Sequence, residues 1–341
     1  MILQAVCAVS WHYVSVDARL ILMDGTSVPV TPDAVNAALT SKSLLWLDVK
    51  QPGPDDVGWL RDTFKLHPLA VDDLTEFGQR PKIEVFPNLI YMVSYGLAGP
   101  TNDLTEVHTF FSDTYMVTVR HDGCHALEQL SDQIIQPGNQ LPNGSRPTRL
   151  ILLHNLMDSL IDSFFPSLAD FDDKIDALQE QIFVKPTNDQ LSELFNMQRW
   201  LVSLRKLITP QRDVLASLVS GMVILPGMSA ESDPYLRDLY DHLIRMSDQI
   251  DAYRDLLSNA MSVYLSMVSN NLNIVMKQLA IIATVFLPLS FLTGFFGQNF
   301  AWLVGKLGSL NVFLILGVGT ELVAVVALYM LFRRRGWLGA A

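Results

Sequence analysis

The sequence predicts an α+β membrane protein, in which a large α/β domain and long helices precede two membrane-spanning helices. Three observations support this fold class. Strand-like runs alternate with helical ones over about the first 125 residues, a helical period follows from Arg149, and two long apolar stretches lie near the C-terminal end. Because 50% of the 341 residues are hydrophobic while 17% are charged, the apolar residues must be concentrated in one part of the chain.

Residues 1–147 are predicted to form a cytoplasmic α/β domain. Runs rich in Val, Ile, Phe and Tyr and bounded by turn residues are typical of strands. These runs are Leu44–Lys50, Ile83–Tyr95, Val107–Ser112 and Tyr115–Arg120. Pro54–Phe64, with acidic residues in its first turn, is predicted to be a short helix, and the Pro- and Gly-rich stretch Gln136–Pro147 a linker.

Residues 148–277 are predicted to form long cytoplasmic helices. Apolar residues recur every three or four positions from Leu160 to Ile182, with aspartates between them, which is typical of one amphipathic helix with an acidic face. After a turn at Lys185–Asn188, a second helix is predicted over about 189–218, kinked at Pro210.

A third helix is predicted to begin near Asp233 and shows no clear break before Pro288. If it continues to Gly297, it is about 90 Å long at about 1.5 Å per residue. Since such a helix cannot be buried in one small globule, we expect it to be a stalk that joins the cytoplasmic region to the membrane.

Two apolar stretches match the length of membrane spans. Residues 278–297 contain no charge, and residues 311–332 contain one acid, Glu321. A buried core helix is the alternative for each stretch, but the chain has little left to cover two of them. Residues 298–310 between the spans are predicted to be an extracytoplasmic loop.

The charge distribution predicts the orientation. Arg333–Arg335 begin a basic tail, residues 333–341, that places the C-terminus in the cytoplasm. With two crossings and no signal-peptide pattern, the N-terminus is expected there too. The sequence therefore predicts a multi-pass plasma (inner) membrane protein in a lipid bilayer, with both termini cytoplasmic.

The net charge favours cations as partners. The formal charge is −11; the residues after 277 carry four cations and one acid, or +3, which leaves −14 on residues 1–277. An acidic cytoplasmic region suits cation binding and argues against nucleic acid, although a surface acidic for solubility alone explains it equally well. Cys7 and Cys124 are the two cysteines, which fits a reducing compartment without disulfides.

Two spans cannot enclose an aqueous path, so transport requires several copies of the chain. The first span has a face of small, hydroxyl and flexible apolar residues at steps of three and four. This face comprises Met276, Ala280, Ala283, Leu287, Ser290 and Gly294. It suits a pore axis, and helix packing in the bilayer is the alternative.

Four segments carry a resemblance to a known family. They are Tyr264–Phe300, His67–Glu84, Tyr115–Cys124 and Tyr235–His242. Through them nearly the whole chain resembles the CorA-type divalent cation transporters, which include magnesium channels and a zinc-transporting branch. The resemblance implies a homopentamer with a cytoplasmic funnel and a pore lined by the first span.

The resemblance also implies the pore residues. The family's Gly-Met-Asn signature at the outer mouth reads Gly297-Gln298-Asn299 here, and Asn299 is expected to present a ring of amide oxygens to a hydrated ion. Gly294 and Ser290 are expected to form a polar ring below it. Mg²⁺ gives up its water reluctantly, so neutral oxygens can hold its hydration shell without trapping the ion.

The resemblance further implies the residues of a gate and of a regulatory metal sensor. Leu287, Leu279 and Met276 match apolar constrictions that close a pore by dewetting, and Asn273 matches a polar ring at the cytoplasmic end. Asp73 and Asp238 match acids of an inter-subunit regulatory metal site. Carboxylates of two subunits repel until a cation bridges them, so loss of Mg²⁺ is expected to favour opening.

Three departures from the family pattern affect these expectations. Gln298 replaces the middle Met of the signature, so the choice of ion is open. The loop Ala301–Ser309 contains Lys306 and no acid, which should weaken cation capture. Ser262 stands where some relatives place an acid of the sensor, so regulation is expected to be blunted or to use other ligands.

Two other features of the sequence have both a functional and an ordinary structural explanation. His121 and His125 flank a turn with Cys124, but one short segment rarely closes a tetrahedral metal site, so an ordinary turn is favoured. Glu321 lies within a span, where an acid is a functional candidate. Pairing with a neighbour or protonation is favoured over a direct role in transport.

We therefore expect a passive Mg²⁺ channel gated by cytoplasmic Mg²⁺. The chain carries no nucleotide-binding glycine loop, nucleophile elbow or His-Glu-x-x-His motif, so no enzymatic activity is expected and flux should follow the electrochemical gradient. The alternatives are a Zn²⁺, Co²⁺ or Ni²⁺ transporter, proton-coupled through Glu321, and a non-conducting membrane-tethered metal sensor or scaffold.

Overall fold

The computed structural model describes residues 17–22, 27–40, 45–99, 103–135, 149–228, 233–298, 301–306 and 308–337. The chain forms two compact units. Met1–Gln179 and Asp189–Ala260 make up the first, and Glu180–Asn188 and Met261–Ala341 make up the second.

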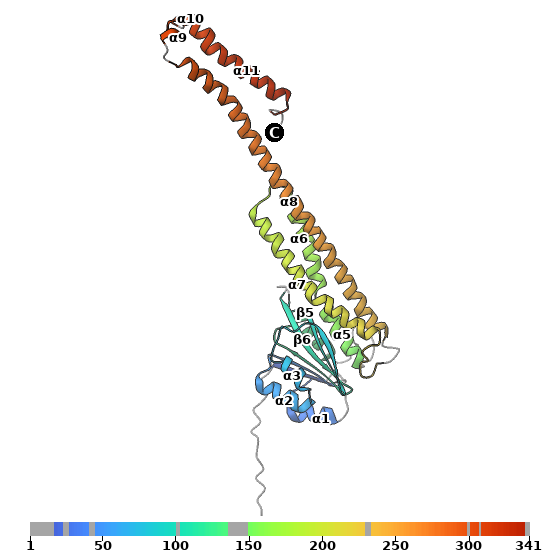
Figure 1. The fold of residues 1–341 in the computed structure, drawn as a ribbon. Coiled ribbons are helices and arrows are strands. Elements are labelled where there is room, and N and C mark those ends of the chain that lie inside the picture. The colour runs from blue at the N-terminus through green and yellow to red at the C-terminus, as the bar shows by residue number, and fades with distance from the viewer. Residues whose placement is uncertain are drawn as a thin grey trace, which may run out of the picture. The chain divides into compact units, whose positions relative to one another are not determined.

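The first unit contains a mixed seven-stranded sheet of order β2-β1-β3-β7-β6-β5-β4. Its strands β5 and β6 are labelled in Figure 1. The strands are β1 (Asp17–Leu22), β2 (Ser27–Val28), β3 (Leu45–Lys50), β4 (Lys82–Phe86), β5 (Leu89–Leu97), β6 (Leu104–Phe111) and β7 (Tyr115–Arg120). β3 and β7 are parallel, with Leu45 opposite Tyr115, and every other neighbouring pair is antiparallel. The predicted α/β domain is thus confirmed.

The run Ile83–Tyr95, predicted as one strand, is two strands joined by a tight turn. Phe86 pairs with Leu89, so Pro87 and Asn88 alone form the connection. Asn88 has a φ of 65°, a left-handed conformation that asparagine tolerates better than most residues. The strong strand propensity on both sides hid this turn from the sequence pattern.

Four helices accompany the sheet, namely α1 (Pro32–Thr40), α2 (Pro54–Phe64), α3 (Pro68–Asp73) and α4 (His125–Ile135). The helix predicted over Pro54–Phe64 is confirmed. The carboxylate of Asp56 accepts a hydrogen bond of 2.9 Å from the backbone N–H of Gly53, which caps the start of α2. Lys65, with a φ of 53°, ends it.

The amphipathic helix predicted from Leu160 to Ile182 is two helices, α5 (Arg149–Asp162) and α6 (Phe165–Val184). Ser163 explains the break. Its hydroxyl donates to the Leu160 carbonyl at 2.6 Å and accepts from the backbone N–H of Leu97 on β5 at 2.8 Å. The chain thus leaves the helix where a sheet strand offers a hydrogen bond, which no local periodicity reveals. The predicted linker Gln136–Pro147 lies outside the described residues.

The next two predicted helices are confirmed as α7 (Asn188–Val219), with Pro210 inside it, and α8 (Asp233–Phe296), which runs without a break for 64 residues. In the first unit, α6, α7 and the beginning of α8 lie side by side (Figure 1). Phe171 of α6 stacks on Trp200 of α7, with ring centres 5.0 Å apart, and packs against Tyr253 of α8 at 5.6 Å.

The second unit contains the apolar end of α8, followed by α9 (Ala301–Lys306), α10 (Leu310–Val312), the wider π-helical turn η2 (Phe313–Val318) and α11 (Gly319–Arg334). The predicted spans 278–297 and 311–332 lie in α8 and in the continuous segment Leu310–Arg334. Large apolar side chains such as Leu287, Phe291 and Leu322 are exposed in the single chain. Such a surface suits lipid or other copies of the chain rather than water.

Candidate ion path and metal-binding residues

The residues predicted to line a pore share one face of α8. α8 is continuous, and these residues follow one another at steps of three or four, or multiples of them, so they form one stripe along the helix. The stripe comprises Asn273, Met276, Leu279, Leu287, Ser290 and Gly294, and each of these residues is exposed in the single chain. Residues 271–280 are exposed on every side of α8, so helical spacing rather than exposure distinguishes this stripe, and a pore wall requires such a stripe from each copy.

α8 ends at the predicted mouth, where the N–H of Gln298 donates to the Phe295 carbonyl, three residues back, at 3.3 Å. The N–H of Gly297 donates to the Thr293 carbonyl at 2.9 Å, and a Cβ at Gly297 would lie 3.0 Å from that carbonyl oxygen. A side chain there would press against the last helical turn, so glycine fits best. Gln298 follows and is exposed. Asn299 lies outside the described residues.

Gly294 has a different environment. A Cβ added at Gly294 would meet nothing within 4 Å in the single chain. Packing within one chain therefore does not explain this glycine.

Asp73, predicted as a regulatory ligand, ends α3 and faces a lysine of its own chain. The Nζ of Lys82 donates to Asp73 Oδ2 at 2.6 Å and to Glu84 Oε1 at 2.8 Å. Burial alone would lower the pKa of Lys82, but the two carboxylates more than offset it, so the pKa is raised and the ammonium stays charged. Lys82 was not predicted from the sequence, although Lys82 and Glu84, two residues apart, share one face of β4.

Asp238, the second predicted regulatory ligand, lies near the start of α8 beside two imidazoles. Its Oδ2 is 3.7 Å from His154 Nε2, and its Oδ1 is 4.0 Å from His242 Nε2. Among the described residues, the groups of side chains close enough to share a metal ion include Asp238 but not Asp73. Neither histidine was predicted from the sequence, although His242 follows Asp238 by four residues on a helix, a spacing that places the two side chains on one face.

The remaining candidate metal ligands lie in surroundings that are typical of ordinary structural residues. His121 packs edge-on against Phe77 with ring centres 4.1 Å apart, whereas His125 accepts a hydrogen bond from the Gln129 amide at 2.9 Å. Their different partners agree with an ordinary turn. Burial raises the pKa of the Cys124 thiol, which disfavours a thiolate ligand.

Three positions singled out by the sequence lie on exposed or partly exposed helix surfaces. Ser262 is exposed on α8, and Lys306 is exposed at the end of α9. Glu321 is partly exposed on α11, and within the ranges that the structure covers no ion pair involves it.

A large mixed-sheet domain, followed by long helices and two apolar helices of membrane length, defines a two-span membrane protein with an extramembrane α/β domain. The family model described as CorA-like Mg²⁺ transporter protein matches residues 41–334. The chain belongs to this family.

Individual relatives agree with the family match. The chain is 33% identical over 289 residues to the cobalt/magnesium transport protein CorA of Thermotoga maritima, covering 83% of this chain and 80% of that protein. It is 27% identical over 296 residues to the zinc transport protein ZntB of Yersinia enterocolitica, covering 84% and 85%. The complete structure of the CorA magnesium transporter from Methanocaldococcus jannaschii superposes with a TM-score of 0.81 at 18% identity, covering 94% and 98%, which shows the shared fold.

Proposed function

We propose that the protein conducts divalent cations across the membrane, with Mg²⁺ as its main ion, as a passive channel. The single observation that carries this function is the 33% identity, over most of both chains, to a protein named for cobalt and magnesium transport. The exposed stripe on α8 supplies a physical route, because several such stripes facing one axis make a wall that a single chain cannot make.

The pore of this proposal is a homopentamer, as the family resemblance implies, with α8 of each copy at the axis. Gly297, Gln298 and Asn299 form its outer mouth, where neutral oxygens hold a hydrated ion. Ser290 and Gly294 form the polar ring below. The end of α8 directly before Gly297 supports this placement, because it puts the start of the signature directly after the stripe.

Gating in this proposal uses the apolar part of the same stripe. Leu287, Leu279 and Met276 close the path by dewetting, with Asn273 at the cytoplasmic end. Asp73 and Asp238 act as the regulatory carboxylates, and both termini lie in the cytoplasm at the plasma (inner) membrane. Lys82, paired with Asp73, adds a competing cation to the proposed sensor.

The test is Mg²⁺ uptake into proteoliposomes that contain a fluorescent Mg²⁺ indicator. Wild type should show ion-dependent flux, and Asn299→Ala should reduce it strongly. Asn271→Ala is a matched control, since Asn271 is exposed on α8 but lies off the stripe. Absence of flux from wild type and both variants would support the non-conducting sensor or scaffold instead.

A second candidate is transport of Zn²⁺, Co²⁺ or Ni²⁺, proton-coupled through Glu321. The similarity to a zinc transport protein favours it, and Gln298 at the mouth leaves the choice of ion open. Uptake of each ion, measured with and without a pH gradient, distinguishes the two candidate functions. Zinc flux that needs a pH gradient and is lost in Glu321→Gln, without Mg²⁺ flux, would replace the first candidate.

A further inference from the structure

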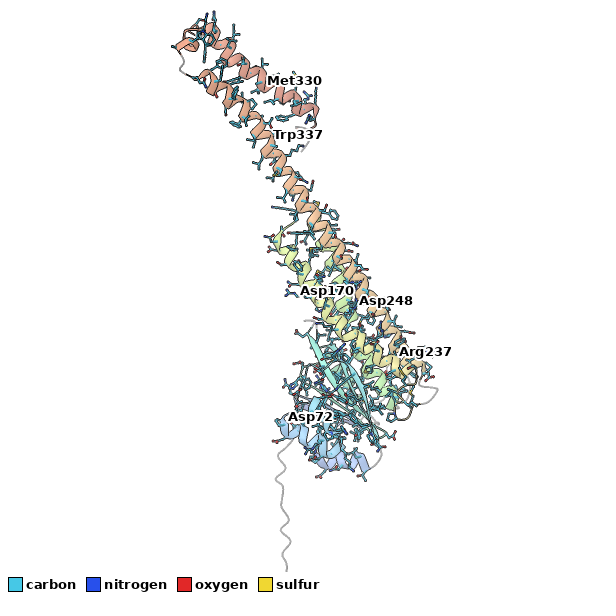
Figure 2. All side chains as sticks on the ribbon, in the orientation of Figure 1. Asp72, Asp170, Arg237, Asp248, Met330 and Trp337 are labelled. Carbon is cyan, nitrogen blue, oxygen red and sulfur yellow. The ribbon has the colours of Figure 1, made fainter. Side chains whose placement is uncertain are left out.

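An open groove of the first unit lies between α7 and the residues Arg80–Ile83, which lead into the edge strand β4. Its volume is about 730 Å³, within the range of cavities that hold small organic ligands. The described residues that line it do not include the carboxylates proposed for the regulatory site. The label Asp72 in Figure 2 marks α3, the helix that precedes the loop with Arg80 along the chain. We propose that this groove binds a nucleotide, with its phosphates at Arg80 and Lys206.

Two cations at the groove have no ionic partner. Among the residues that the structure describes, neither Arg80 nor Lys206 makes an ion pair, although the chain as a whole carries a formal net charge of −11. Pairing within the chain therefore does not explain why both cations line one groove. Guanidinium and ammonium groups are the usual protein partners of phosphate oxygens, so a phosphate would supply the missing negative charge.

The other two charged side chains at the groove are already paired. The guanidinium of Arg205 donates to Oδ1 of Asp251 on α8, and the carboxylate of Asp213 lies 3.4 Å from the guanidinium of Arg212. Arg205 therefore offers the groove mainly its aliphatic part, and the negative charge of Asp213 is partly offset. The two unpaired cations leave the groove favourable to an anion.

Tyr95 of β5 ties both walls of the groove to the sheet. Its backbone N–H donates to Oε1 of Gln211 on α7 at 2.7 Å, and its hydroxyl donates to the carbonyl of Gln79, next to Arg80, at 2.6 Å. Glu106 holds the same loop, because its Oε1 accepts a hydrogen bond of 3.0 Å from the backbone N–H of Gln79. The backbone on both sides is thus fixed before a ligand arrives, which lowers the entropy cost of binding.

Pro210 leaves a free hydrogen-bond acceptor at the groove. Proline has no backbone N–H, so the carbonyl of Lys206, four residues earlier on α7, loses its usual helical partner. Thr209 also lines the groove, and within the described part of the chain its hydroxyl makes no hydrogen bond. A free carbonyl and a free hydroxyl beside Pro210 suit the hydroxyl groups of a sugar.

The rest of the groove is apolar. Its apolar surface comes from Pro81, Ile83, Val202, Pro210 and Val214. A planar base would cover this surface, whereas a free inorganic anion would leave it in water. Cations, sugar-binding groups and apolar surface together favour a nucleotide over inorganic phosphate.

The test uses the full-length protein in an uncharged detergent, in a buffer with EDTA that keeps Mg²⁺ away from the regulatory carboxylates. A fluorescent ATP analogue is bound and then displaced by ATP or by inorganic triphosphate. We expect one saturable site per chain and tighter binding of ATP than of inorganic triphosphate. Arg80→Gln and Lys206→Gln should each weaken ATP binding by about tenfold, the effect of losing one hydrogen bond to a charged group.

Arg199→Gln is the matched control, because it removes the same charge from an exposed position about two helical turns before Lys206 on α7. Its ATP affinity should equal that of wild type. Arg80 and Lys206 are exposed, so both groove variants should fold and keep the wild-type melting temperature. Binding is measured without ion flux, so the result does not depend on the proposed transport function.

Four outcomes would each overturn the proposal. They are the absence of saturable ATP binding, unchanged affinity in Arg80→Gln and Lys206→Gln, equal weakening in Arg199→Gln, and equal affinity for inorganic triphosphate. The third would show a general attraction of anions to exposed cations, and the fourth would show that the apolar surface takes no part.

Discussion

The Nζ of Lys82 lies 2.6 Å from the Oδ2 of Asp73 and occupies one side of this carboxylate. Both side chains are largely buried, with 29% and 18% exposed. Because an ammonium and a metal ion cannot occupy the same side of one carboxylate, Lys82 would compete for Asp73 with the regulatory ion of the proposed sensor.

The first prediction follows from this competition. Lys82→Met should increase the affinity of the regulatory site for Mg²⁺ by about fivefold, equivalent to about 1 kcal/mol of lost competition. The measurement is the Mg²⁺ concentration that half-inhibits flux in proteoliposomes. Lys50→Met is the control, since Lys50 is similarly exposed and lies 4.0 Å from Glu128. An unchanged or higher inhibitory concentration in Lys82→Met would argue against Asp73 as a ligand.

The second prediction concerns the pH dependence of stability at Glu106, which is buried on β6. Burial alone would raise the pKa of Glu106, but the neighbouring His108 and the backbone N–H of Gly78 more than offset it, so the pKa is lowered. A lowered pKa in the folded state stabilises the protein above the ordinary glutamate value of 4.5, and this contribution is lost as pH falls through the lowered pKa.

Glu106→Gln should therefore be less stable than wild type near neutral pH, and the difference should shrink below about pH 4.5. The melting temperatures of the two solubilised proteins, measured between pH 3 and pH 7 at steps of about half a pH unit, test this difference in stability. Glu76→Gln is the control, because Glu76 is exposed and lies two residues before Gly78. A difference that grows toward acidic pH would show that the sign of the shift is wrong.

The third prediction concerns the close approach of β5 and α5. A Cβ at Gly96 would lie 2.7 Å from Cδ2 of Leu160 and 3.3 Å from its Cα and carbonyl oxygen, so α5 itself would have to move. Gly96→Val should lower the free energy of unfolding by about 1–3 kcal/mol. Gly58→Ala is the control, because a Cβ at Gly58 meets nothing within 4 Å and alanine favours a helix. Equal melting temperatures for Gly96→Val and wild type would contradict the packing described here.

The parts of the fold that the sequence predicted well are those with strong local signals. The helix α2 has an acidic first turn and a proline start, and α8 has no strong helix breaker before Pro288. The break at Ser163 was missed because it depends on the backbone N–H of Leu97, on a strand far away in the sequence. Local periodicity carries no information about such a partner.

The candidate sites also divide into features with a local sequence signal and contacts between distant segments. Most of the stripe on α8 was predictable because helical spacing places Met276, Leu287, Ser290 and Gly294 on one face, whereas Asn273 and Leu279 were implied by the family resemblance. Lys82 beside Asp73, and His154 beside Asp238, were missed because each contact joins two separate elements. His154 and Asp238 are brought together by the packing of α5 against α8, which neither helix specifies by itself.

The last prediction tests the gate on the stripe. Leu287 is exposed on α8 in the single chain, and in the proposed assembly it narrows the path with an apolar ring that excludes water. Leu287→Asn should hydrate this level and increase Mg²⁺ flux severalfold at inhibitory Mg²⁺ concentrations. Leu289→Asn places the same side chain two residues further on, on the opposite face of the helix, and should leave flux near that of wild type. Because both variants add the same polar group to one span, a general loosening of the helix would raise flux in both. Higher flux in Leu287→Asn alone would assign the barrier to the stripe, whereas higher flux in Leu289→Asn alone would place the path on the other side of α8.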